Sequence, residues 1–68
     1  MNKNLLRAKM AEFGDTYKSL AEYLGIAPST LAKKVNEYKG TQFTQEEISR
    51  MKNLYKLTDS EVVAIFFA

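Results

Sequence analysis

The chain has 68 residues, enough for one domain and close to the lower limit at which a single apolar core stabilises a fold unaided. Hydrophobic residues make up 46% and charged residues 26%, which excludes a disordered segment, and the net charge of +2 only slightly favours an acidic partner. Cysteine and histidine are both absent, which excludes disulfides, thiol and imidazole catalysis, and the usual zinc and haem sites.

Neither end of the chain has the pattern of an export or membrane segment. Lys3, Arg7 and Lys9 interrupt the apolar residues of the first stretch, so it does not read as a signal peptide. The longest apolar run, residues 62–68, is too short to cross a bilayer. We therefore expect one domain over residues 1–68, located in the cytoplasm and without membrane contact.

Helical periodicity runs through nearly the whole chain, and no stretch alternates apolar and polar residues as a half-buried strand does, so the predicted class is all-α. The first helix is predicted over residues 4–13, and its buried face holds Leu6, Met10 and Phe13. Gly14 ends this helix. Either Asp15 or Thr16 then supplies the capping oxygen of a second helix.

The second and third predicted helices are short, and only a few residues join them. The buried stripe of the second helix has i, i+3, i+4, i+7 spacing and consists of Tyr17, Leu20, Ala21 and Leu24. Gly25 ends that helix. The third helix is predicted from Pro28 to about Glu37, because proline suits a first helical turn, and Leu31 and Val35 form its inward face.

Two capping boxes mark the remaining helices. Thr44 and Thr58 each precede a glutamate by three residues, which is the spacing of a reciprocal helix cap. The fourth helix is therefore predicted to end near Lys56, and a fifth begins after Thr58. The hydrophobic pairs that accompany these caps are Phe43 with Ile48 and Leu57 with Val62.

Residues 17–36 meet the demands of a tight joint between two helices. Gly25 allows a positive φ, and Ala21 provides the small side chain that a close crossing requires. The apolar wedge that would fix the angle consists of Leu20, Leu24, Ile26, Leu31 and Val35. This spacing resembles the helix-turn-helix of the Cro and repressor family of phage and bacterial regulators. The resemblance extends to the preceding helix, to the connector leading to Phe43, and to the closing residues 65–67.

The resemblance implies an all-α, five-helix lambda-repressor-like domain with a central helix-turn-helix. It further implies a transcriptional repressor, encoded by a phage or prophage, that binds double-stranded DNA at a pseudo-palindromic operator. We expect a homodimer at least on DNA, with half-sites about 34 Å apart, because one short helix covers too few base pairs. No cofactor, metal or small-molecule ligand is expected. The chain lacks a catalytic constellation, so we do not expect an enzyme.

The third helix is the element expected in the major groove. Its face opposite Leu31 and Val35 supplies the candidates for base readout, which are Ser29, Ala32, Lys33 and Asn36, with Thr30 at the edge. Asn36 either pairs with an adenine or caps the end of the helix. The candidates for phosphate contact lie at the start of the second helix and around the end of the third; they are Tyr17, Lys18, Lys34, Lys39, Thr41 and Gln42.

Some residues depart from the family pattern. Tyr17 stands where many members have a glutamine that reaches a phosphate, and Ala27 replaces a capping serine or threonine. Lys34 stands where relatives carry a branched apolar residue, with Val35 taking over the packing role.

Taken alone, Lys33 and Lys34 would be interpreted as solvated residues of a surface helix. Their place on the second helix of this motif favours DNA contact instead. The apolar residues near the C-terminus exceed what one face of a short helix buries; they are Val62, Val63, Ile65, Phe66 and Phe67. Part of them should close the core or form a dimer contact, and the two uses are compatible. The candidates for the dimer contact, called the C-terminal apolar cluster below, are Val62, Val63, Phe66 and Phe67. The alternative function is a protein-interaction module with a helix-turn-helix fold that docks through this apolar helix.

Overall fold

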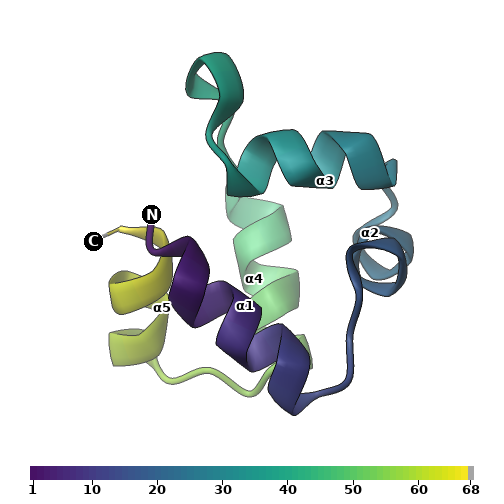
Figure 1. Cartoon of the computed structure of the whole chain (residues 1–68). Coiled ribbons are helices and arrows are strands. Elements are labelled where there is room, and N and C mark those ends of the chain that lie inside the picture. Colours follow the sequence, from purple (N-terminus) through teal and green to yellow (C-terminus); the bar gives the residue numbers. More distant parts are fainter. Residues whose placement is uncertain (68) are drawn as a thin grey trace.

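The computed structural model describes residues 1–67. Its five α-helices and one short 3-10 helix are α1 (Lys3–Glu12), α2 (Tyr17–Leu24), α3 (Pro28–Val35), η1 (Tyr38–Gly40), α4 (Gln45–Leu54) and α5 (Asp59–Phe66). Residues 1–67 contain no strand, so the predictions of an all-α class and of five α-helices are confirmed. In Figure 1, α3 lies across one end of the molecule with η1 projecting beyond it, and α5 lies beside both termini. None of the helices in this range has the length and apolar character that a membrane span requires.

N-cap side chains mark the starts of α2, α4 and α5, as predicted. Thr16, and not Asp15, caps α2 by accepting the backbone N–H of Ser19 at 3.2 Å. Thr44 and Thr58 each form a reciprocal capping box with the glutamate three residues later. Each start thus has a local cap, in which the threonine hydroxyl and the side chain three residues later bind each other's backbone N–H groups.

The bounds of α1 differ slightly from the prediction. It begins at Lys3 because the Asn2 side chain accepts the backbone N–H of Leu5 at 3.2 Å. It ends at Glu12, and Phe13 is the C-cap. The prediction that Phe13 belongs to the buried face was wrong: its side chain is 43% exposed, and its ring meets Tyr55 edge-on with the centroids 5.2 Å apart. Phe13 therefore covers the core from outside.

Both α3 and α4 end two residues earlier than predicted, at Val35 and Leu54. Glu37 and Lys56 have φ of 53° and 52°, in the left-handed region. A right-handed helix cannot continue through such a residue, and the conformation costs a non-glycine residue roughly 1–2 kcal/mol. Neither position is a glycine, so the sequence carries no signal for these two ends.

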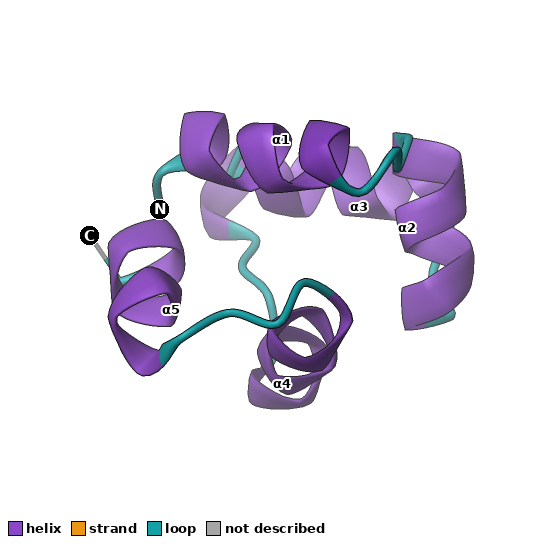
Figure 2. Cartoon of the chain, turned by 90° about the horizontal axis from the view of Figure 1, so that it is seen from below, coloured by secondary structure: helices purple, strands orange, loops and turns teal. Residues whose placement is uncertain are grey.

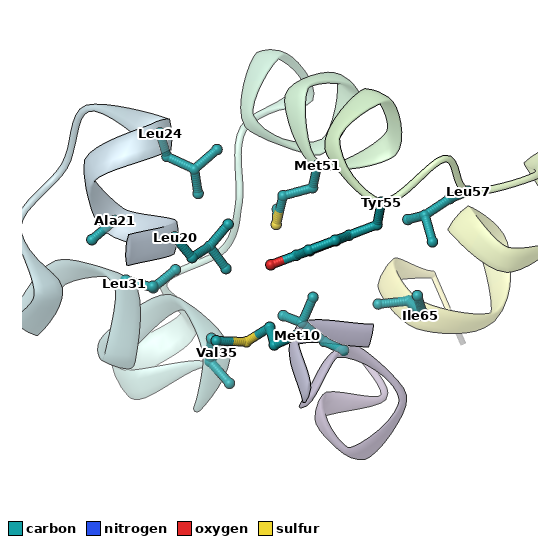
Figure 3. Close-up of a cluster of buried hydrophobic side chains, with 11 residues drawn as sticks. Met10, Leu20, Ala21, Leu24, Leu31, Val35, Met51, Tyr55, Leu57 and Ile65 are labelled. Carbon is teal, nitrogen blue, oxygen red and sulfur yellow. The ribbon is translucent and has the colours of Figure 1, made fainter. Parts of the chain in front are cut away.

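The core draws residues from all five helices and from the turn before α5. Figure 3 shows its side chains converging around the Tyr55 ring. The core residues are Leu6, Met10, Leu20, Ala21, Leu24, Leu31, Val35, Met51, Tyr55, Leu57 and Ile65. The buried positions predicted for α2 and α3 are confirmed, except that Tyr17 and Ile26 are only partly buried.

The Tyr55 hydroxyl connects the end of α4 to the start of α2. It donates to Oδ2 of Asp15 at 2.8 Å, while Oδ1 of Asp15 accepts the Ser19 hydroxyl at 2.7 Å. Burial of the ring and the neighbouring Asp15 carboxylate raise the pKa of Tyr55 well above its usual value, so the hydroxyl stays a donor. This hydrogen bond satisfies the one polar group of the most central side chain.

Replacement of Tyr55 with phenylalanine should remove only this hydrogen bond. Because the acceptor is a carboxylate, we expect the free energy of unfolding to fall by about 1.5–3 kcal/mol in urea denaturation at neutral pH. Tyr23→Phe is the matched control, since the Tyr23 hydroxyl donates to the Arg50 carbonyl oxygen at 3.3 Å from an exposed ring. The control should change stability by at most about 0.5 kcal/mol. Equal effects of the two substitutions would contradict this prediction.

Candidate nucleic-acid interface

A short turn centred on Gly25 joins α2 to α3. Gly25 has φ 74° and ψ 30°, and the backbone N–H of Ile26 donates to the Ala21 carbonyl oxygen at 3.0 Å. A Cβ placed on Gly25 would meet no atom within 4 Å, so the glycine is needed for its backbone conformation and not for space. Pro28 then occupies the first turn of α3, as predicted.

The exposed face of α3 lies opposite its buried residues. Leu31 and Val35 enter the core, with relative exposures of 0% and 1%. Three of the candidates for base readout are exposed: Ser29, Lys33 and Asn36. The other two, Thr30 and Ala32, are half-buried. The structure therefore brings all five to the outward or lateral sides of one short helix.

Asn36 is engaged by its own helix. Its Nδ2 donates to the Ala32 carbonyl oxygen at 2.9 Å, which caps the last turn of α3. Its Oδ1 accepts from Nζ of Lys3 at 3.4 Å. Of the two roles considered for Asn36, the helix-end cap is the one formed in this structure.

Lys34 lies on the side of α3 that faces α4. Its Nζ donates to both carboxylate oxygens of Glu47, at 2.6 and 2.8 Å, and the lysine side chain is only 12% exposed. Glu47 also accepts the backbone N–H of Thr44 at 2.9 Å. The ammonium group predicted to contact phosphate is thus directed into the protein, because position 34 follows the buried Leu31 by one helical turn.

An exposed tyrosine ring lies close to two of the candidate lysines. The ammonium groups of Lys33 and Lys39 lie 5.9 and 5.4 Å from the centroid of the Tyr38 ring. Cation–π contacts of this kind are worth about 0.5–1 kcal/mol at exposed sites. Sequence analysis did not assign this role to Tyr38, although its position between the two lysines was a usable signal. The ring brings a readout candidate and a phosphate candidate together.

The remaining phosphate candidates lie at the two ends of the α2–α3 unit. Tyr17 begins α2 and is partly buried, and Lys18 beside it is exposed. Thr41 and Gln42 follow η1 in the connector to α4, half-buried and exposed respectively. The Tyr17 hydroxyl accepts hydrogen bonds from the Arg7 guanidinium of α1, a residue that sequence analysis did not assign to the site.

The C-terminal apolar cluster divides between core and surface. Val62 and Phe66 pack against the core, and the Phe66 ring meets Phe43 edge-on at 5.9 Å between centroids. Val63 and Phe67 are 56% and 66% exposed. Half of the cluster therefore closes the monomer, and the other half faces outward.

Cationic side chains are distributed unevenly over the molecule. Within residues 1–67, the lysines and arginines that pair with carboxylates are Lys9, Lys34, Arg50 and Lys52. Those without a carboxylate partner in this range are Lys3, Arg7, Lys18, Lys33, Lys39 and Lys56. All but Lys56 belong to the segment from α1 to η1, which includes α2 and α3. Comparisons with protein-family models, curated proteins and solved structures found no match for the chain.

Removal of the Lys34 ammonium should destabilise the fold because it leaves Glu47 buried without its cation. We expect Lys34→Met to lower the free energy of unfolding by about 2–4 kcal/mol, near the range for broken buried ion pairs. The control is Arg50→Gln, which breaks the exposed pair with Glu46 and should cost less than about 1 kcal/mol. In the double variant Lys34→Met, Glu47→Gln, part of the stability should return. Urea denaturation measures all four proteins, and similar losses in Lys34→Met and Arg50→Gln would refute the role given to Lys34.

The same ion pair should make stability depend on pH. Burial raises the pKa of Glu47. Hydrogen bonds from Lys34 and from the Thr44 backbone together lower it by more than burial raises it, so the pKa lies below its usual value. An acid with a depressed folded-state pKa stabilises the fold fully above its unfolded-state pKa, near 4.3, and this contribution is lost as pH falls through the folded value. The stability difference between the wild type and Glu47→Gln should therefore shrink from about pH 5 to about pH 3 in urea denaturation. A difference that stays constant with pH would contradict this assignment.

Proposed function

We propose that the chain is a sequence-specific double-stranded DNA-binding domain with a lambda-repressor-like fold, and that α3 reads the major groove. The observation that carries the proposal is the two-sided character of α3. Leu31 and Val35 hold one side in the core, while Ser29 and Lys33 stand on the other with no partner carboxylate for the lysine in residues 1–67. The major groove, about 12 Å wide, admits one α-helix.

The geometry supports separate roles for the polar residues of the site. Lys33 can donate to guanine O6 and N7, Ser29 and Thr30 can bond base edges, and Ala32 can touch a thymine methyl group. Phosphate contacts are assigned to Tyr17, Lys18, Lys39, Thr41 and Gln42. Lys34 and Asn36 are given other roles here: Lys34 fixes α3 against α4, and Asn36 caps its end.

The proposed biological activity is repression of transcription through occupation of an operator in a bacterial cell, by a regulator of phage or prophage origin. The eight residues of α3 span about 12 Å, which covers only a few base pairs. A homodimer on a pseudo-palindromic operator, with Val63 and Phe67 in the subunit contact, would double the sequence that is read.

Selection from a random-duplex library at near-physiological salt tests this proposal. The wild type should enrich a motif with two-fold symmetry. Lys33→Ala should change the preferred bases, since a bidentate lysine–guanine contact is worth roughly 1–3 kcal/mol of discrimination. Lys39→Ala is the matched control on the same Tyr38 ring, and it should weaken all duplexes about equally. No enrichment by the wild type would refute sequence-specific binding; enrichment with equal losses in both variants would reduce Lys33 to a phosphate contact.

The second candidate function is a protein-interaction module. The observation that favours it is the exposure of Val63 and Phe67 on α5 and just after it. Docking through these side chains should be nearly independent of salt and should be lost in Val63→Ser, Phe67→Ser. Binding to a duplex should instead weaken steeply between about 50 and 200 mM salt, because phosphate contacts release counterions.

A further inference from the structure

Arg7 reaches from the first helix to the start of the helix-turn-helix. Its Nε–H and an Nη2–H donate to the Tyr17 hydroxyl oxygen at 3.4 and 3.3 Å. Tyr17 is the first residue of α2, so a cation from α1 stands beside the residue already proposed to contact phosphate. In Figure 2, α1 extends toward the end of the molecule where α2 lies.

Arg7 and Tyr17 have hydrogen-bond donors that the contact between them does not use. The guanidinium has five N–H donors, of which Tyr17 accepts two, and Arg7 has no carboxylate partner in residues 1–67. The Tyr17 oxygen is occupied as an acceptor, and its own O–H has no acceptor among these residues. Both side chains therefore present donors and a positive charge to an acceptor outside the chain.

The nearby carboxylates do not neutralise Arg7. Asp15, two residues before Tyr17, uses its two oxygens for Ser19 and Tyr55. Glu12, on α1, pairs with Lys9. The Arg7 guanidinium therefore forms no ion pair within residues 1–67, and its charge remains available to an anion outside the chain.

A second cation lies on the same face of α1. Lys3 precedes Arg7 by four residues, so the two side chains lie one turn apart on one side of the helix. Nζ of Lys3 contacts Asn36 at the end of α3, while Arg7 contacts Tyr17 at the start of α2. One face of α1 thus places a cation at each end of the α2–α3 unit.

We propose that Arg7 and Tyr17 together bind one phosphodiester of the DNA backbone, so that α1 is part of the DNA interface. This inference rests on the proposed function. The remaining N–H groups of the Arg7 guanidinium and the Tyr17 O–H donate to the non-bridging oxygens of a single phosphate. Planar guanidinium donors suit such oxygens in geometry and in charge.

Fluorescence anisotropy on the selected duplex tests the site with single-charge variants. At about 0.15 M salt, Arg7→Gln should weaken binding about tenfold and lower the slope of log affinity against log salt by about 0.9, the value for one lost phosphate contact. Tyr17→Phe should weaken binding about three- to fivefold, and much less in the Arg7→Gln background, because both groups serve one phosphate. Lys56→Gln is the control: it removes one exposed, carboxylate-free cation from the α4–α5 turn and should change affinity less than about twofold.

A series of duplexes, each with one phosphate replaced by neutral methylphosphonate, locates the contact. One replacement per half-site should weaken the wild type about tenfold and leave Arg7→Gln unaffected. Arg7→Lys keeps the positive charge but lacks the planar guanidinium donors. It should therefore keep the slope of log affinity against log salt and bind with intermediate affinity. Circular dichroism and thermal unfolding establish that each variant is folded.

Two results overturn the inference, and they can be told apart. If the wild type binds the duplex while Arg7→Gln behaves like Lys56→Gln, or every methylphosphonate weakens both proteins alike, the Arg7–Tyr17 site is refuted and the proposed function stands. If the wild type binds no duplex at any salt concentration, the proposed function and this site both fail.

Discussion

The carboxylate of Glu47 links α3 to the start of α4. It accepts the Thr44 backbone N–H at the start of α4 and two hydrogen bonds from Lys34 of α3. An isolated helix of eight residues is unstable in water, so α3 exists because Leu31, Val35 and this ion pair hold its inner side. These contacts therefore set the orientation in which the outer side of α3 would meet a ligand. One residue thus begins one helix and orients another.

Much of the fold was predictable because its signals are local. Gly25, Pro28 and the two threonines that begin capping boxes act on backbone groups within four residues, and helical spacing alone identified the buried positions of α2 and α3. The ends of α3 and α4 were not predictable, because Glu37 and Lys56 adopt positive φ without a glycine. Left-handed conformations of non-glycine residues have no residue pattern that predicts them from the sequence.

The candidate site was predictable in outline and not in detail. Periodicity gives the face of α3 that points outward, but it does not say which polar groups on the helix already have partners. Asn36 is bonded to the Ala32 carbonyl oxygen, and Lys34 is bonded to a carboxylate thirteen residues away in the sequence. The contact between Arg7 and Tyr17 was not predictable either, because helical spacing gives only the buried face of α1 and this contact joins two helices.

Local pairing makes the net charge a poor measure of what the surface can bind. Carboxylates pair with Lys52 and Arg50 of α4, Lys9 of α1 and Lys34 of α3. The other cations from α1 to η1 lack such partners in residues 1–67; they are Lys3, Arg7, Lys18, Lys33 and Lys39. Because the Debye length is about 8 Å at physiological salt, an anion at this surface is attracted mainly by the cations closest to it. The ammonium groups of Lys33 and Lys39 both lie close to the Tyr38 ring, so two cations without a carboxylate partner in residues 1–67 stand beside one exposed aromatic side chain. The charge that an anion would meet at this part of the surface is therefore set by these nearby cations and not by the net charge of +2.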